Sequence, residues 1–132
     1  MCCFQPQTKK ARQAYRAFPR MIVWWGTVVE SSSALFRLER EKELSTQEMQ
    51  QALRGLEKHR EHWDEVIPTD GVRNLAERLL KAQPLRAADA LQLAAALVWC
   101  ASQSKGRNFI CADDRLIEAA EKEGFNVIKI EE

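Results

Sequence analysis

The stretch Leu85-Arg86-Ala87-Ala88-Asp89-Ala90-Leu91-Gln92-Leu93-Ala94-Ala95-Ala96-Leu97-Val98-Trp99 is apolar on nearly every side. A helix of this composition is buried, because a surface helix carries polar residues along one face. Asp89 is the exception within it, since an unpaired buried carboxylate is costly or becomes protonated. We therefore expect Asp89 to have a partner, which is a cation, a set of hydrogen-bond donors or a metal ion.

Short apolar segments alternate with helical patterns on both sides of this stretch. The expected strands are 21–25, 65–68, 109–111 and 126–130, and the expected helices are 8–18, 27–42, 46–64, 70–80, 85–99 and 113–123. This alternation predicts an α/β fold with a parallel sheet covered on both faces. The length favours a single domain over residues 1–132. Ligands in such folds bind at the carboxyl ends of the strands.

Net charge and cysteine content limit the kinds of protein that this chain can be. The net charge of +1 gives no strong field toward nucleic acid or membrane. The four cysteines, Cys2, Cys3, Cys100 and Cys111, match no zinc spacing and suggest no disulfide framework. We expect Cys100 and Cys111 to be buried as small hydrophobic residues. The chain is thus expected in the cytoplasm, without a membrane span.

Carboxylates follow two of the expected strands. Glu30 comes shortly after strand 21–25, and Asp113 comes directly after strand 109–111. Both therefore belong at the carboxyl edge of the sheet, whereas the pattern alone does not place Asp89 at either edge. Three carboxylates meeting there would suit Mg²⁺ or Mn²⁺ better than zinc. Such a site supports metal-assisted hydrolysis of phosphodiester bonds.

Each of these acids also has a structural interpretation. Thr27 and Glu30 fit a capping box, with Thr27 at the N-cap. Asp113 is a good N-cap, and Arg86 can pair with Asp89 one turn away. These roles are compatible with metal binding, because a capped carboxylate keeps one free oxygen. In an unrelated α/β domain with purely structural acids, the three carboxylates should instead be mutually distant.

Aromatic and basic residues offer a route to RNA binding. We expect Trp24 and Trp25 to fill the core, with base stacking as the alternative. Basic residues that form either a phosphate-binding rim or ordinary surface charge are Lys9, Lys10, Arg12, Arg16, Arg37, Arg40, Arg86 and Arg115.

Three motifs in series resemble the PIN-domain family, in particular the VapC-like toxins. Val23-Trp24-Trp25-Gly26-Thr27-Val28-Val29-Glu30, followed by Ser33-Ala34-Leu35-Phe36-Arg37-Leu38-Glu39-Arg40, is similar to the family's second strand and following helix. Pro84-Leu85-Arg86-Ala87-Ala88-Asp89-Ala90-Leu91-Gln92-Leu93-Ala94 resembles its helix with a conserved aspartate. Phe109-Ile110-Cys111-Ala112-Asp113-Asp114-Arg115-Leu116 resembles the next strand and last acidic motif. The resemblance covers roughly residues 6–131.

The resemblance implies a Mg²⁺- or Mn²⁺-dependent endoribonuclease of a type II toxin–antitoxin system. Its fold is a Rossmann-like three-layer domain with a parallel sheet of 4–5 strands, and a cognate antitoxin inhibits it by occluding the site. The implied catalytic and metal-binding residues are Glu30, Asp89 and Asp113, with Asp114 as a further metal ligand. Cys111 stands where the family usually has Thr or Ser, and Gln92 where it often has His. Apolar surface on the helices of 27–64 also makes a homodimer plausible.

One departure concerns the N-terminus. The family begins with a strand ending in Asp-Thr or Asp-Ser, whereas the first aspartate here is Asp64. Residues 6–12 resemble the family's second helix, so residues 1–7 are atypical and the opening strand is shortened or missing. Either the true opening is absent, or residues 1–4 act as a short strand. Since that strand is central in the family, a sheet without it would be split.

The missing aspartate bears on activity. We expect weakened metal affinity and poor or absent nuclease activity, because no residue replaces that carboxylate as an equal ligand. The alternative is a degenerate, non-catalytic PIN domain that acts as an antitoxin- or partner-binding module. In that case Arg86 and backbone amides should satisfy the carboxylates.

Overall fold

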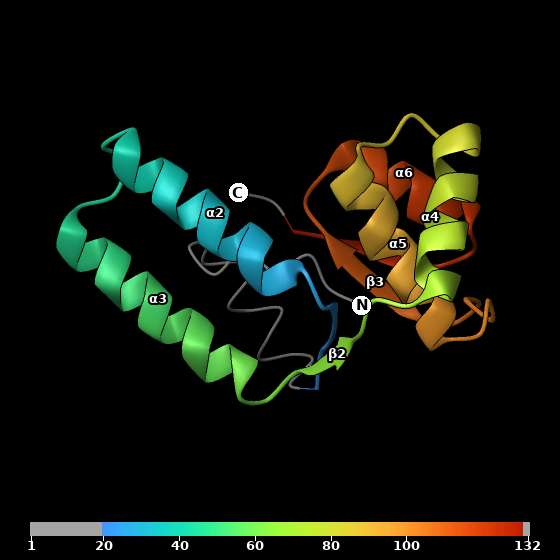
Figure 1. The fold of residues 1–132 in the computed structure, drawn as a ribbon, viewed down its shortest axis with the longest axis horizontal. Helices are drawn as coiled ribbons and strands as arrows, with labels where there is room; N and C mark the ends of the chain where they lie inside the picture. Colours follow the sequence, from blue (N-terminus) through green and yellow to red (C-terminus); the bar gives the residue numbers. More distant parts are fainter. Residues whose placement is uncertain (1–19, 131–132) are drawn as a thin grey trace.

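The computed structural model describes residues 20–130, which form five helices and four short strands (Figure 1). In chain order these are β1 (Ile22–Trp24), α2 (Thr27–Arg40), α3 (Thr46–Arg60), β2 (Asp64–Val66), α4 (Asp70–Ala82), α5 (Ala87–Trp99), β3 (Asn108–Cys111), α6 (Asp114–Lys122) and β4 (Asn126–Lys129). Every element expected within this range is present, with some ends shifted by a few residues. The expected helix 8–18 lies outside the described residues. No helix within 20–130 is long and apolar enough to cross a membrane.

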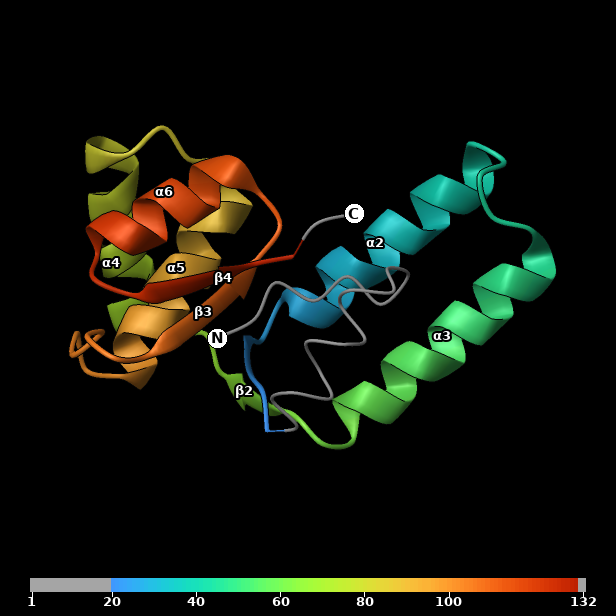
Figure 2. The same cartoon turned by 180° about the vertical axis from the view of Figure 1, so that it is seen from behind.

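The strands form two parallel pairs. β1 pairs with β2, with Ile22 opposite Asp64, and β3 pairs with β4, with Phe109 opposite Val127. Figure 2 shows β3 and β4 side by side. The mixed α/β prediction is therefore confirmed. Among residues 20–130 the strands form two two-stranded sheets, and a sheet of four or five strands is not seen within this range.

Burial differs between the strands of each pair. Val23 of β1 and Phe109 of β3 are fully buried, whereas Asp64 and Glu65 of β2 are exposed. β4 is only partly buried. The expectation of strands covered on both faces is thus wrong for β2 and β4. Each of them is an edge strand, and exposed charges on an edge discourage further pairing.

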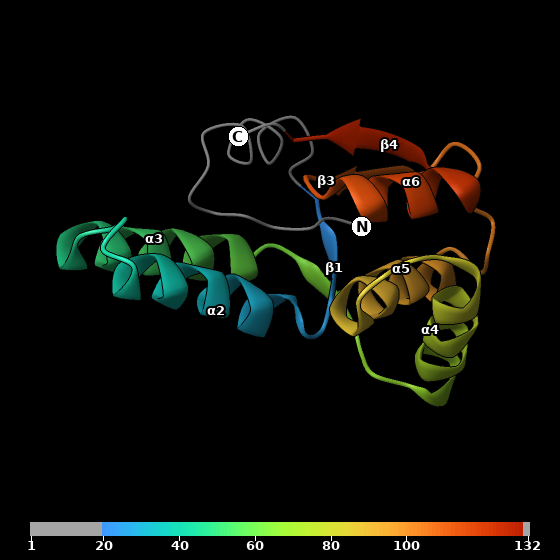
Figure 3. The same cartoon turned by 90° about the horizontal axis from the view of Figure 1, so that it is seen from above.

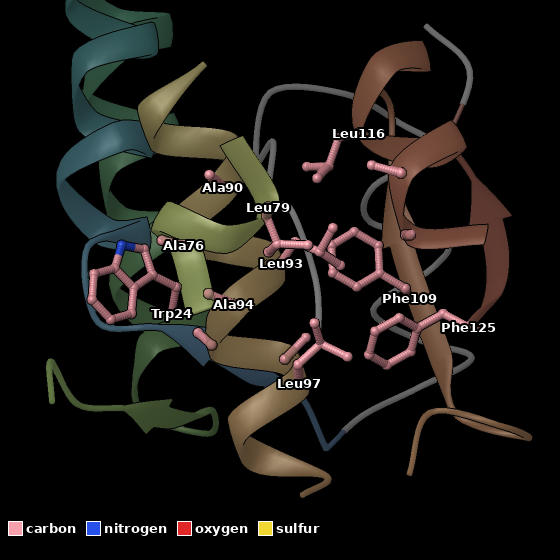
Figure 4. Close-up of a cluster of buried hydrophobic side chains, with 14 of the residues drawn as sticks. Trp24, Ala76, Leu79, Ala90, Leu93, Ala94, Leu97, Phe109, Leu116 and Phe125 are labelled. Atoms are coloured by element: carbon pink, nitrogen blue, oxygen red, sulfur yellow. The ribbon is translucent and has the colours of Figure 1, made fainter. Parts of the chain in front are cut away.

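Helix α5 is the centre of the main core. Residues 92–97 are all buried, which confirms the prediction from composition. Leu93 and Leu97 of α5 point toward Phe109 and Phe125, and Leu79 of α4 packs into the same cluster (Figure 4). This packing fixes the start of α5 relative to the strands.

Helices α2 and α3 form an antiparallel pair that extends away from this core (Figure 3). Leu35 of α2 and Leu56 of α3 belong to a second apolar cluster, which also includes Val23 and Ile110. α3 begins with a complete capping box, in which Ser45 accepts from the Glu48 amide and Glu48 accepts from the Ser45 amide. The second cluster therefore holds the base of the helix pair against both strand pairs.

The two adjacent tryptophans have different environments. Trp24 is buried as expected, but Trp25 is 52% exposed, so the prediction of a core position is wrong for Trp25. The Trp25 amide bonds to the Val66 carbonyl at 3.0 Å, which continues the ladder of β1. Successive side chains of a strand point to opposite faces, so one indole packs inward and the next outward. Cys100 and Cys111 are buried free thiols, as predicted.

Candidate functional site

An open cavity of about 510 Å³ lies where three helices begin. Residues from the start of α2, the start of α5 and the junction between β3 and α6 line it. Its polar lining residues include Thr27, Glu30, Arg37, Arg86, Asp89, Gln92 and Asp113. The structure therefore brings Glu30, Asp89 and Asp113 to one place. The three acids are therefore not scattered over separate parts of the fold, as was expected for purely structural acids.

Asp89 lies in the first turn of α5, with its side chain 17% exposed. Burial raises the pKa of this carboxyl, and the negative charge of Asp113 raises the pKa further. The Arg86 guanidinium acts in the opposite direction, since its Nε lies 3.8 Å from Asp89 Oδ2. The predicted Arg86 pairing is thus confirmed. It is a weak pair, because Arg86 is 77% exposed.

Glu30 lies in the first turn of α2 and is held from α5. Gln92 Nε2 donates a hydrogen bond to Glu30 Oε2. Burial raises the pKa of Glu30, the bond from Gln92 lowers it, and the charge of Asp89 raises it again. The carboxylate is therefore fixed at the cavity by an uncharged donor.

The capping box expected for Thr27 and Glu30 is wrong. The N-cap of α2 is Gly26, and its carbonyl accepts the Glu30 amide at 3.1 Å. The helix begins one residue earlier than the box requires, so Thr27 already lies inside it. Glu30 is consequently free of the cap and reaches Gln92 instead.

Asp113 caps α6, as predicted. Its Oδ1 accepts a hydrogen bond from the Leu116 amide at 3.0 Å. Its Oδ2 lies 3.8 Å from Arg86 Nη2, so the same guanidinium stands near both aspartates. The Asp113 amide in turn donates to Cys111 Sγ at 3.3 Å, which holds the turn between β3 and α6. One carboxylate oxygen therefore faces the cavity while the other stabilises the helix.

Asp114 is not brought into this group. It does not line the cavity, and its Oδ1 pairs with Lys129 Nζ at 2.9 Å on the exposed surface. Among the basic residues of the expected rim, Arg37 and Arg86 line the cavity. Lys9, Lys10, Arg12 and Arg16 lie outside the described residues.

The donor set suits a hard divalent cation. Within residues 20–130, no group of three or more His, Cys, Asp or Glu side chains is gathered closely enough to hold a metal ion as it stands. Mg²⁺, however, usually keeps several waters and takes only one or two carboxylates. Burial raises the pKa of both Glu30 and Asp89, and a neighbouring carboxylate raises each further, Asp89 acting on Glu30 and Asp113 on Asp89; a bound cation would favour the ionised forms. The chemistry of the carboxylates therefore fits Mg²⁺ or Mn²⁺.

Sequence reasoning gave no chemical role to Gln92, and it gave Thr27 a capping role that the structure does not show. Gln92 is a buried amide three residues after Asp89 in an apolar helix, and this spacing indicates that the two side chains lie on the same face of the helix. Thr27 is only 2% exposed, and its Oγ1 has no hydrogen-bond partner among residues 20–130. No local signal distinguishes this unpartnered threonine from a capping one.

Replacing Thr27 with valine should raise the free energy of unfolding by about 0.5–1.5 kcal/mol. Valine has nearly the same shape and removes a buried hydroxyl that makes no hydrogen bond. Urea unfolding of the metal-free protein measures this change. Thr27→Ser keeps the hydroxyl and serves as control. A valine variant less stable than the wild type would mean that the hydroxyl is satisfied.

Comparison with protein-family models finds no match to this chain, and comparison with curated proteins finds none either. The resemblance to the PIN family therefore rests on the motifs of the sequence alone.

Proposed function

We propose that this protein is a Mg²⁺- or Mn²⁺-dependent endoribonuclease of the PIN-domain toxin class, with weak metal affinity. One observation carries the proposal: Glu30, Asp89 and Asp113, which are far apart in the sequence, line a single open cavity. They come from α2, α5 and the turn before α6 in the order in which the family's acidic motifs occur. The proposed setting is a type II toxin–antitoxin system in the cytoplasm.

The finer fold that accompanies this function is a Rossmann-like, three-layer PIN domain. Its parallel sheet of four or five strands would contain β1–β2 and β3–β4 as two halves. Support comes from the direction of pairing, because both pairs are parallel. Helices connect the paired strands in each case, as parallel pairing requires.

The residues that line the cavity would have different roles in the reaction. Glu30, Asp89 and Asp113 would hold the cation, which when bound lowers the pKa of a water and stabilises charge on the phosphoryl oxygens. Gln92 orients Glu30, and the cap of α6 orients Asp113. Arg37 and Arg86 bring positive charge to the rim, where an RNA phosphate needs it.

An exposed apolar face on α2 supports the proposed protein partners. Val29 and Phe36 are exposed and lie seven residues apart, so they share one side of α2, and Trp25, just before the helix, is exposed as well. Val29 also lines the cavity, so a protein bound to this face would cover the carboxylates. A cognate antitoxin and a second copy of the chain are the two partners that we propose.

Asp113→Asn is expected to lower Mn²⁺-dependent cleavage of a single-stranded RNA about 10-fold or more. Asparagine caps a helix as well as aspartate does, so the fold should be retained while the charge is lost. Fluorescence cleavage assays with and without chelator measure the effect.

The adjacent Asp114→Asn is the matched control, since Asp114 pairs with Lys129 outside the cavity. Its cleavage rate should stay within about two-fold of the wild type. Equal losses in the two variants, or cleavage that survives the chelator, would contradict the proposed site.

A non-catalytic, partner-binding PIN domain is the second candidate. A specific observation favours it: Arg86 already lies near both Asp89 and Asp113, where it neutralises part of the charge that a cation would meet. A folded wild-type chain that cleaves no RNA at saturating Mn²⁺ would establish this candidate over the first.

A further inference from the structure

We propose that Gln92 is the positioning residue of the cation site: its side-chain amide holds the Glu30 carboxylate at the cavity through an uncharged hydrogen bond. This inference rests on the metal-dependent function proposed above and deepens it. Gln92 lines the same cavity as the carboxylates, and it links α5 to α2 through the bond from its Nε2 to Glu30 Oε2.

Burial makes this bond important. Gln92 is 7% exposed and lies in a run of buried leucines and alanines. A buried amide is unfavourable unless it is hydrogen-bonded, whereas an apolar side chain of the same size carries no such cost. The contribution of the amide therefore lies in its hydrogen bonding, and the partner that it reaches in the cavity is Glu30.

Glu30 needs such a partner more than the two aspartates do. A glutamate has one more side-chain torsion to fix than an aspartate, so an unheld carboxylate loses more freedom when it binds a cation. Asp113 is already fixed by the Leu116 amide. Gln92 supplies the corresponding restraint for Glu30 and leaves its second oxygen for a ligand.

The neutral charge of the donor is equally relevant. Arg86 stands near Asp89 and Asp113 as a cation, so it competes with any metal ion for them. An amide donates a hydrogen bond without adding positive charge to the cavity. Of the carboxylates at this site, Glu30 is consequently held in place without a competing cation.

The test is a double-mutant cycle read by Mn²⁺ titration calorimetry on the full chain. The variants are Gln92→Met, Glu30→Gln and the two combined. Methionine has nearly the length and volume of glutamine and suits an apolar helix, so the fold should be kept. Gln83→Leu is the matched control, because Gln83 is at the end of α4 and bonds Lys122 away from the cavity.

Gln92→Met should weaken Mn²⁺ binding about 10-fold in the wild type. In the Glu30→Gln background the same change should alter the affinity by less than about two-fold, because the two residues act as one unit. Gln83→Leu should leave the affinity unchanged, and circular dichroism checks that each variant is folded.

Each other outcome overturns a stated claim. An equal loss in both backgrounds means that Gln92 has only a general structural role. An unchanged affinity in Gln92→Met, with Mn²⁺ still bound by the wild type, removes the role of Gln92 and leaves the proposed function intact. A wild type that binds no Mn²⁺ overturns the cation site and the role of Gln92 together.

Discussion

Asp89→Asn should stabilise the metal-free protein at pH 7 while it strongly lowers metal-dependent cleavage. Burial and the charge of Asp113 raise the pKa of Asp89, which means that its ionised form is unfavourable in the fold. Asparagine has the same shape without the charge. The weak pair with the exposed Arg86 is lost in exchange, and this loss is small.

The stabilisation should depend on pH in a defined direction. The pKa of Asp89 in the fold lies above its ordinary value of 3.8, so between these two values the folded state binds more protons than the unfolded state. Stability is therefore lost as the pH rises through the folded pKa. The gain from Asp89→Asn should be widest near neutral pH and should shrink as the pH falls toward that ordinary value.

Urea unfolding at a series of pH values measures this difference. Asp70→Asn is the matched control, since Asp70 is also in the first turn of a helix but is fully exposed beside Arg73. The difference between the two variants isolates the effect of burial at Asp89. An Asp89→Asn variant that is less stable than the wild type at pH 7 would show that the carboxylate is well paired after all.

The functional part of the same prediction is larger. An asparagine amide is a poor ligand for Mg²⁺ or Mn²⁺. Asp89 is also the carboxylate that interacts with both of the others, because its charge raises the pKa of Glu30 and the charge of Asp113 raises the pKa of Asp89. Cleavage should fall on the order of 100-fold or more.

We expect the wild type itself to bind Mg²⁺ weakly, with a dissociation constant on the order of 1 mM, so micromolar binding would contradict this prediction.

The elements could be predicted from the sequence because their signals are local. The alternation of apolar segments and helical patterns predicted every helix and strand of residues 20–130, and the apolar composition of α5 predicted its burial. Glu30 and Asp113 each follow the end of a strand, so their meeting at one cavity could be expected from the sequence. The position of Asp89 depended on how α5 packs against β3 and α4, and no local pattern contains that information.

Two errors have the same origin. Thr27 and Glu30 match a capping box in sequence, but the partner of Glu30 is Gln92, 62 residues further along the chain. Trp25 is apolar and adjacent to a buried strand, yet the alternation of the strand turns it outward. Both side chains are placed by tertiary contacts or by register, which a short sequence window does not determine.

Phe109→Ala should cost about 3–5 kcal/mol of the free energy of unfolding. Phe109 is completely buried in β3, and its ring lies 5.5 Å from that of Phe125, between centroids, in the cluster around α5 (Figure 4). Alanine leaves a cavity among Leu93, Leu97 and Phe125 that these side chains fill only in part. Because small domains are stable by about 5–15 kcal/mol in total, the variant should be close to unfolding.

The loss should extend to the candidate site, since β3 leads directly into Asp113 and the cap of α6. Urea unfolding gives the stability change, and Mn²⁺ titration at low temperature reports on the site. Ile67→Ala is the control, because Ile67 is a large apolar residue exposed to solvent and its removal should change stability by less than about 0.5 kcal/mol. A Phe109→Ala cost below about 1 kcal/mol would mean that this aromatic cluster does not hold β3 against α5.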